Sequence, residues 1–207
     1  MGNRAITMVM ASFAADSLAL GAHWIYDTQT IEAYLGRVDA LLKPQPDSYH
    51  STKALGDFTH YGDQMFVLLE SLTAQKGFSP GDFSTRWKTL FENYNGYVDQ
   101  ATQGTLAGYD SGKGPKGGGS PSDDLAGAAR IAPLVYAYSD HLENLIDAAK
   151  TQTQMTHTNP LTVESAARGV VVGMVLGAHS GDESLPLEWI SVLNKEQQIA
   201  RMLKQLR

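Results

Sequence analysis

The sequence contains no cysteine. Disulfide bonds, thiolate nucleophiles and zinc sites built on cysteine are therefore excluded. A chain without disulfides suits a reducing compartment, so we expect a cytoplasmic protein.

Positive charge is also scarce. The chain has 16 Lys and Arg against 22 Asp and Glu, which gives a net charge of -6 and a pI near 5.4. Proteins that bind nucleic acids through the phosphates need a basic surface. We therefore expect no nucleic-acid partner.

A long hydrophobic run is missing as well. The apolar stretch over residues 6–15 follows a single positive charge, Arg4, and is interrupted by Thr7 and Ser12. A helix needs about 20 apolar residues to cross a bilayer. This stretch is too short and too polar for that, and its single charge is a poor match for a signal peptide. We expect a buried first helix and no membrane partner.

What is present is typical of a globular helical protein. With 207 residues, 43% of them hydrophobic and 18% charged, the chain favours one packed domain over residues 1–207. Apolar residues recur at helical spacing, and no convincing strand alternation occurs, so the fold class is all-α. We expect Gly77 to cap a central helix, Pro133 to kink a later one, and residues 108–119 to form a loop. Helices should begin near the following residues, with one or two more pieces between Glu183 and Arg207: Asn3, Asp27, Gly62, Ser79, Val98, Ser120, Ser139 and Asn159.

The central stretch is residues 56–65, GDFTHYGDQM, where a polar approach changes abruptly into an apolar helical pattern. A single acid at such a place, here Asp63, is usually a cap or a first-turn residue that suits the helix dipole. Its neighbours favour a functional role, because His60, Tyr61 and Gln64 add three more polar side chains within one turn of a buried helix start.

Other acids interrupt or begin apolar helices. Asp16 lies inside the first helix, where an acid is costly unless it is paired or lies at a polar site. Asp123 and Asp124 follow the glycine-rich loop; they suit a helix N-terminus, and they could also hold a divalent cation, so both interpretations stay open. The loop itself contains GKGPKG at residues 112–117, formally a G-x-G-x-x-G. No strand precedes it, so a dinucleotide site is improbable.

Five segments in order resemble one family. ADSLALG at 15–21 resembles the Gly-Asp-Ala-Leu-Gly opening of ADP-ribosylglycohydrolases, and GDQM at 62–65 resembles the end of their Thr-Asp-Asp-Thr-Gln-Met motif. DLAGAARIAPL at 124–134 is similar to their Arg-x-x-Pro helix, and THTNP at 156–160 to their Thr-His-x-x-Pro turn. GMVLGA at 173–178 with LPLEW at 185–189 resembles the closing segment. The resemblance is closest to the branch related to J1-crystallins.

The resemblance implies a compact, orthogonal multi-helix bundle that hydrolyses N- or O-glycosidic bonds of ADP-ribosyl substrates with Mg²⁺. Hard cations bind carboxylate oxygens and can position ribose hydroxyls and a water. The candidate catalytic residues are Asp63, Gln64 and His60. The candidate ligand-binding residues are Tyr61, Asp124, His157 and Asn159. The candidate metal ligands are Asp16, Asp63, Asp123 and Asp124, of which we expect Asp16, Asp63 and Asp124 to converge on one concave site.

The sequence departs from the family where the metals should bind. Alignment on Gln64 puts Tyr61 and Gly62 in the places of the two acids of the first motif, and the late Asp-x-Asp-Thr motif has no counterpart. We therefore expect weak or absent hydrolysis. A non-catalytic, crystallin-like structural or ligand-binding protein is the alternative, and an unrelated helical interaction module is a third hypothesis.

The chain is also shorter than the family pattern. Gly169 is only nine positions after Pro160, where several helices are expected, so the helix after the turn should join the last glycine-rich helix directly. The lost helices would leave apolar surface for a partner subunit to cover, so we expect a homo-oligomer, most simply a twofold dimer. The residues at issue are Val170, Val171, Val172, Met174 and Val175.

Overall fold

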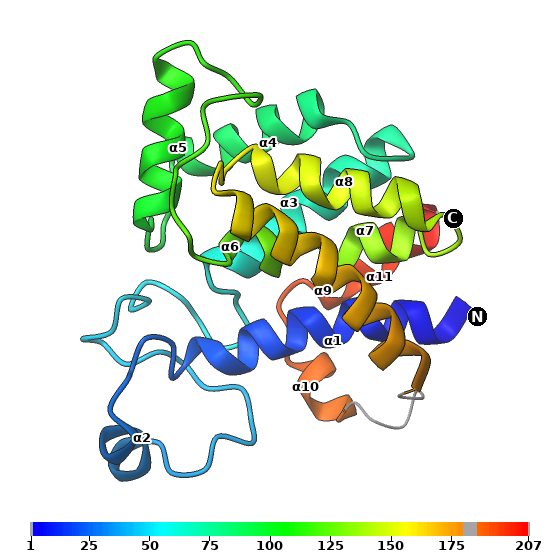
Figure 1. Cartoon of the computed structure of the whole chain (residues 1–207). Coiled ribbons are helices and arrows are strands. Elements are labelled where there is room, and N and C mark those ends of the chain that lie inside the picture. Colours follow the sequence, from blue (N-terminus) through cyan, green and yellow to red (C-terminus); the bar gives the residue numbers. More distant parts are fainter. Residues whose placement is uncertain (1, 180–185, 207) are drawn as a thin grey trace.

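Helix α3 (His60–Gln75) lies at the centre of the protein and is buried on nearly every side (Figure 1). In the computed structural model, which describes residues 2–179 and 186–206, its two faces contribute to two apolar clusters. Leu68 and Leu72 pack with α4, α7, α8 and α9. Phe66 and Leu69 pack with α1 and α11 on the opposite side. After its polar first turn, α3 buries apolar side chains on more than one face, as expected of the core helix of such a bundle.

Helices α1, α4, α6, α7 and α11 contact α3, and the expected all-α class is confirmed. Within the described ranges, the one pairing of strand type is an isolated bridge between Ser120 and His157. No described helix is long and apolar enough to cross a membrane. The bounds are α1 (Gly2–Leu20), α2 (Thr28–Tyr34), α4 (Pro80–Glu92), α5 (Gln100–Asp110), α6 (Ala126–Ala129), α7 (Ala132–Ala137), α8 (Leu142–Gln154), α9 (Pro160–His179), α10 (Leu187–Ser191) and α11 (Glu196–Leu206).

Several helix starts follow from caps that the sequence predicts. The carboxylate of Asp27 accepts from the N–H of Gln29, and Ser79 accepts from Asp82. At the start of α9, Oδ1 of Asn159 accepts from the N–H of Leu161 at 2.9 Å. Such side chains satisfy N–H groups that have no partner inside the helix, which fixes where the helix begins.

Two helix ends differ from the prediction. Lys76, not Gly77, takes the left-handed conformation after α3, with φ at 55°. The chain leaves the helix one residue early because the N–H of Phe78 donates to the hydroxyl of Tyr138 at 2.8 Å. Helix α5 continues to Asp110, into the predicted loop. Gly108 permits this, because a Cβ there would lie 2.1 Å from the carbonyl oxygen of Gly118, where the loop packs against the helix.

The prediction that a helix begins at Ser120 is also wrong. Ser120 is extended instead: its N–H donates to the carbonyl of Thr156 at 2.9 Å, and its own carbonyl accepts from Thr158 at 2.8 Å. Helix α6 therefore begins only at Ala126. Pro133 does not kink a longer helix, because it lies in the first turn of the separate helix α7, where no N–H is needed.

Two segments frame the ends of the bundle. Residues 35–59 are irregular, as the prolines in this stretch predict, and with α2 they project from the helices at the lower left of Figure 1. Helix α9 runs without interruption from Pro160 to His179, so the predicted direct junction holds. The side chains of Val170, Val171, Val172, Met174 and Val175, on which the predicted dimer rests, lie outside the described part.

Candidate functional site

The N-terminus of α3 is fixed by Thr59 and tied to α1 through Asp16. The Thr59 hydroxyl accepts from the N–H of Tyr61 at 3.1 Å and donates to Oδ1 of Asp16 at 2.6 Å. The Thr59 N–H donates to Oδ2 of Asp16 at 2.8 Å. Gly62 makes this approach possible, because a Cβ there would lie 2.3 Å from Oδ2 of Asp16.

Asp16 is a perturbed carboxyl. Burial raises its pKa to about 6, although the two bonds from Thr59 act in the opposite direction and the charge of Asp63 adds to the rise. The sequence predicts that an acid inside the first helix needs a partner. The structure gives Asp16 that partner in Thr59, the N-cap of α3.

Asp63 lies in the first turn of α3 and is already paired with a cation. Its Oδ2 accepts from the ammonium of Lys53 at 2.5 Å and from the hydroxyl of Tyr94 at 2.7 Å. Lys195 lies 4.0 Å from its other oxygen. Burial, followed by the charge of Asp63, raises the pKa of Tyr94 well above its usual range, so the phenol remains a donor.

Gln64 points the other way, into a buried polar network around Arg130. Its amide oxygen accepts from the indole of Trp87 at 2.7 Å and from Nη1 of Arg130 at 2.6 Å. Arg130 is fully buried and also donates to Gln152 at 2.7 Å and to Thr156 at 2.5 Å. Burial lowers the pKa of Arg130 to about 10, so it carries its charge at neutral pH. This network joins α3, the α6–α7 connection and α8.

Asp124 and His157 form a second pair beside the α3 N-terminus. Nε2 of His157 lies 2.8 Å from Oδ1 of Asp124, and the hydroxyl of Ser122 donates to Oδ2 at 2.5 Å. Burial alone would raise the pKa of Asp124, but these bonds hold it well below its usual range. The neighbouring Asp123 is exposed. Asn159 is the α9 cap described above.

Tyr61 lies between these groups. Burial raises its pKa above its usual range, and the charges of Asp99, Asp124 and Asp16 add to the rise. The structure thus brings Asp16 and Asp63 to the start of α3 and Asp124 within electrostatic reach of Tyr61. Gln64 is directed away from them.

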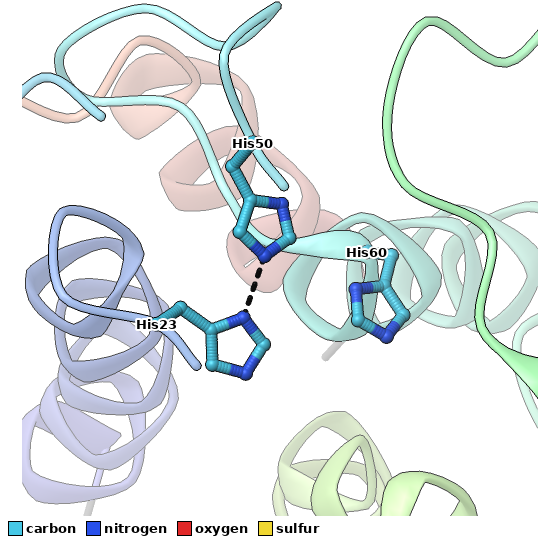
Figure 2. A group of neighbouring side chains, drawn as sticks. All are labelled: His23, His50 and His60. Atoms are coloured by element: carbon cyan, nitrogen blue, oxygen red, sulfur yellow. Dashed lines mark hydrogen bonds between the residues drawn. The ribbon is translucent and has the colours of Figure 1, made fainter. Parts of the chain in front are cut away.

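A cluster of three histidines adjoins the same helix start, and the sequence interpretation included only His60. His23 follows α1, His50 lies in the irregular segment, and His60 is the first residue of α3. One ligand nitrogen from each lies within 4.8 Å of the others (Figure 2). The three could hold a metal ion. Nothing in their sequence spacing indicates this, because 27 and 10 residues separate them and no short metal motif applies.

The cluster is enclosed by aromatic rings. Trp24, with φ at 65°, stacks on His23 with ring centroids 4.7 Å apart, and Tyr61 lies 3.9 Å from the ring of His60. Burial lowers the pKa of His23 and of His50 to about 4, so both imidazoles are uncharged at pH 7. Nδ1 of His23 and Nε2 of His50 lie 2.7 Å apart.

A pocket of about 690 Å³ opens next to the cluster. His23 and Trp24 line it together with the exposed residues Tyr26, Tyr34 and Tyr49. An aromatic-lined pocket of this size suits a planar ligand that stacks.

The acids near α3 do not fit the pair of magnesium ions implied by the family pattern. Mg²⁺ binds octahedrally through oxygen ligands at about 2.0–2.1 Å, including one or two carboxylates. A cation at Asp63 would have to displace the ammonium of Lys53. Both oxygens of Asp16 accept from Thr59, and both oxygens of Asp124 are engaged by His157 and Ser122.

Comparisons with known proteins agree with this fold. A solved structure titled "ADP-ribosylglycohydrolase-related protein complex" aligns with a TM-score of 0.78 over 99% of this chain and 97% of that chain. At 17% identity this likeness shows the fold alone, and it shows that the fold occurs at about this length. No curated protein matches the chain. The family model described as ADP-ribosylglycohydrolase matches residues 1–168, and the chain therefore belongs to the ADP-ribosylglycohydrolase family.

Proposed function

We propose that this protein binds an ADP-ribosyl ligand but hydrolyses N- and O-glycosidic ADP-ribosyl bonds with magnesium only weakly or not at all. The observation that carries the proposal is the ion pair between Lys53 and Asp63. Asp63, one position after the places of the two lost acids, offers the one carboxylate in the family's first metal motif, and its charge is compensated within the protein.

Among the candidate catalytic residues Asp63, His60 and Gln64, none can supply the chemistry that magnesium would supply. A pair of ions would polarise the substrate and lower the pKa of an attacking water. His60 touches Asp99 and Tyr61, so it is not placed as a free base beside Asp63, and the amide of Gln64 is engaged by Arg130. Each metal ligand that is lost reduces both affinity and geometric control.

The pocket favours retained ligand binding, which makes a non-catalytic binding protein the second candidate. Trp24, Tyr26 and Tyr34 line the pocket, and stacking of an adenine on an aromatic ring is worth about 1–3 kcal/mol per base.

Within the family, we place the chain nearest the J1-crystallin-related branch because of the order of its motifs.

Turnover is the direct test. ADP-ribosyl-arginine and ADP-ribosyl-serine peptides, incubated with the protein and Mg²⁺, should release ADP-ribose no faster than they do without protein. Magnesium-dependent release that Asp63→Asn abolishes and the exposed control Asp140→Asn leaves intact would overturn the proposal.

Binding is measured separately, by calorimetry with ADP-ribose. We expect binding that Tyr26→Ala weakens and that does not depend on Mg²⁺. A chain that neither binds nor turns over these ligands would exclude the ADP-ribosyl proposal altogether.

We further propose that the protein is cytoplasmic and self-associates, most simply as a twofold dimer. The apolar sequence of α9 after Gly169 supports the self-association. Sedimentation at micromolar concentration should give twice the mass of one chain, and a monomer would contradict the dimer.

A further inference from the structure

The histidine cluster has the composition and position of a transition-metal site. His23, His50 and His60 come from three separate segments, yet their rings face one another (Figure 2). They are half of the six histidines in the chain. Convergence of three imidazoles from distant segments is expected where one ion holds them together.

Buried nitrogens without partners point to a ligand. Among the described residues, Nδ1 of His50 and both ring nitrogens of His60 are buried and make no hydrogen bond. Both side chains are 0% exposed. Buried polar atoms without partners are rare because each costs about 1–3 kcal/mol, and an ion among the three rings would give Nδ1 of His60 the partner it lacks.

Asp99 is placed to orient His60. Its Oδ2 lies 2.8 Å from Nε2 of His60, off the direction of a hydrogen bond. In Figure 2 one ring nitrogen of His60 faces the other two rings. Because Nε2 is next to Asp99, Nδ1 is the nitrogen that can bind an ion. A carboxylate behind a metal-bound histidine is a common arrangement that fixes the ring and raises its basicity.

The geometry points to one divalent transition-metal ion bound by His23, His50 and His60, with Asp99 as the carboxylate that positions His60. Imidazole nitrogens favour Zn²⁺ and its neighbours over Mg²⁺. With Zn–N at about 2.0–2.1 Å, two nitrogens on one tetrahedral Zn²⁺ lie about 3.3 Å apart. The 2.7 Å contact between His23 and His50 must lengthen and the widest spacing of 4.8 Å must shorten, each through small ring rotations.

Three protein ligands leave a fourth position. His23 lines the 690 Å³ pocket as well as the cluster, so this position faces the pocket and takes water or an oxygen of a bound ligand. The proposed ligands do not include Lys53 or Asp63, and binding of the ion does not depend on the proposed hydrolase weakness.

The test uses untagged full-length protein, because a histidine tag would bind the same ions. After removal of metal with chelator and dialysis against Zn²⁺, elemental analysis should find one Zn²⁺ per chain, and excess Mg²⁺ should not displace it. Co²⁺ should give the visible bands of a tetrahedral site. Less than one Zn²⁺ per ten chains would overturn the proposal.

Variants locate the ion. His23→Gln and His50→Gln should each weaken Zn²⁺ binding at least 100-fold, and Asp99→Asn should weaken it about 10- to 100-fold. His141→Gln, an exposed histidine at the start of α8, is the matched control and should bind as the parent does. One Zn²⁺ that survives both His23→Gln and His50→Gln would place the ion elsewhere. If these variants fail to fold by circular dichroism, X-ray absorption of the parent decides: fewer than three imidazoles around Zn²⁺ would refute the site.

Discussion

At the scale of single residues, Gly62 shows how closely α1 approaches α3. A Cβ at this position would lie 2.3 Å from Oδ2 of Asp16 and 2.7 Å from Cβ of Phe58. Gly62→Ala should therefore destabilise the protein by about 3 kcal/mol, the upper end for overpacking. Urea unfolding measures this. Gly81→Ala is the control, because nothing lies within 4 Å of its added Cβ and alanine favours the helix. Equal stability of the two variants would contradict the tight approach.

Asp16 should make the folding stability fall as the pH rises, whereas an acid whose pKa is lowered on folding makes it increase. Because burial raises its folded-state pKa to about 6 from 3.8, the folded state holds the proton more tightly. The stability it contributes is present below about pH 4 and is lost as the pH rises through 6. Asn cannot ionise, so the stability of Asp16→Asn relative to the parent should improve between pH 4 and 7, by about 3 kcal/mol at most.

Urea unfolding of both chains at intervals across this range is the measurement. The histidines that also titrate there are common to the two proteins, so their contribution cancels in the difference. A difference that stays constant with pH would show that Asp16 is charged throughout.

At the scale of helices, Thr59 does more than cap α3. Thr59→Ala removes the cap of Tyr61 and also the hydroxyl donor to Asp16. Ser79→Ala removes a cap alone, at the start of α4. A cap is worth about 1 kcal/mol and a hydrogen bond to a charged group about 1.5–3 kcal/mol. We expect Thr59→Ala to lose roughly 2–4 kcal/mol and Ser79→Ala about 1 kcal/mol in urea unfolding. Equal losses would mean that the tie to Asp16 contributes nothing.

The sequence predicts helices well where local chemistry decides them. Asp27, Ser79 and Asn159 begin helices because each is a good cap, and the apolar spacing after Asp63 marks the core helix. Prediction fails at Ser120, because a backbone pairing with the distant Thr156 keeps that segment extended. Lys76 ends α3 for a similar reason, a bond between Phe78 and Tyr138 from another part of the chain.

The site is less predictable than the fold because its partners are distant in sequence. Asp16 and Asp63 stand out as acids in apolar surroundings, and both do lie at the start of α3. Lys53 neutralises Asp63, but nothing in the sequence distinguishes it from other lysines in polar loops. His23 and His50 likewise look like ordinary loop histidines. They meet His60 only in the folded chain, where the irregular segment of residues 35–59 carries His50 to the end of α1 and the start of α3.

At the scale of the whole molecule, the family match ends at residue 168 but the hydrophobic core does not. Ile199 and Leu203 of α11 are fully buried between α1 and α3. The Leu203 carbonyl accepts from the hydroxyl of Tyr136 at 2.8 Å, and Lys76 donates to the carbonyl of Gln205. The last helix therefore closes the side of the core that α1 and α3 form.

We therefore predict that residues 1–194, without α11, lack a cooperative urea transition and a near-ultraviolet circular dichroism signal. In the full chain, Leu203→Ala should lose about 2–5 kcal/mol, because it removes a fully buried side chain. Arg201→Ala, on the exposed side of the same helix, should stay within about 0.5 kcal/mol of the parent. If the shortened chain unfolds cooperatively at the parent's urea midpoint, α11 only covers the bundle. If it does not, the family's matched region is not an independent folding unit here, because α1 and α3 need the final helix to bury their shared apolar faces.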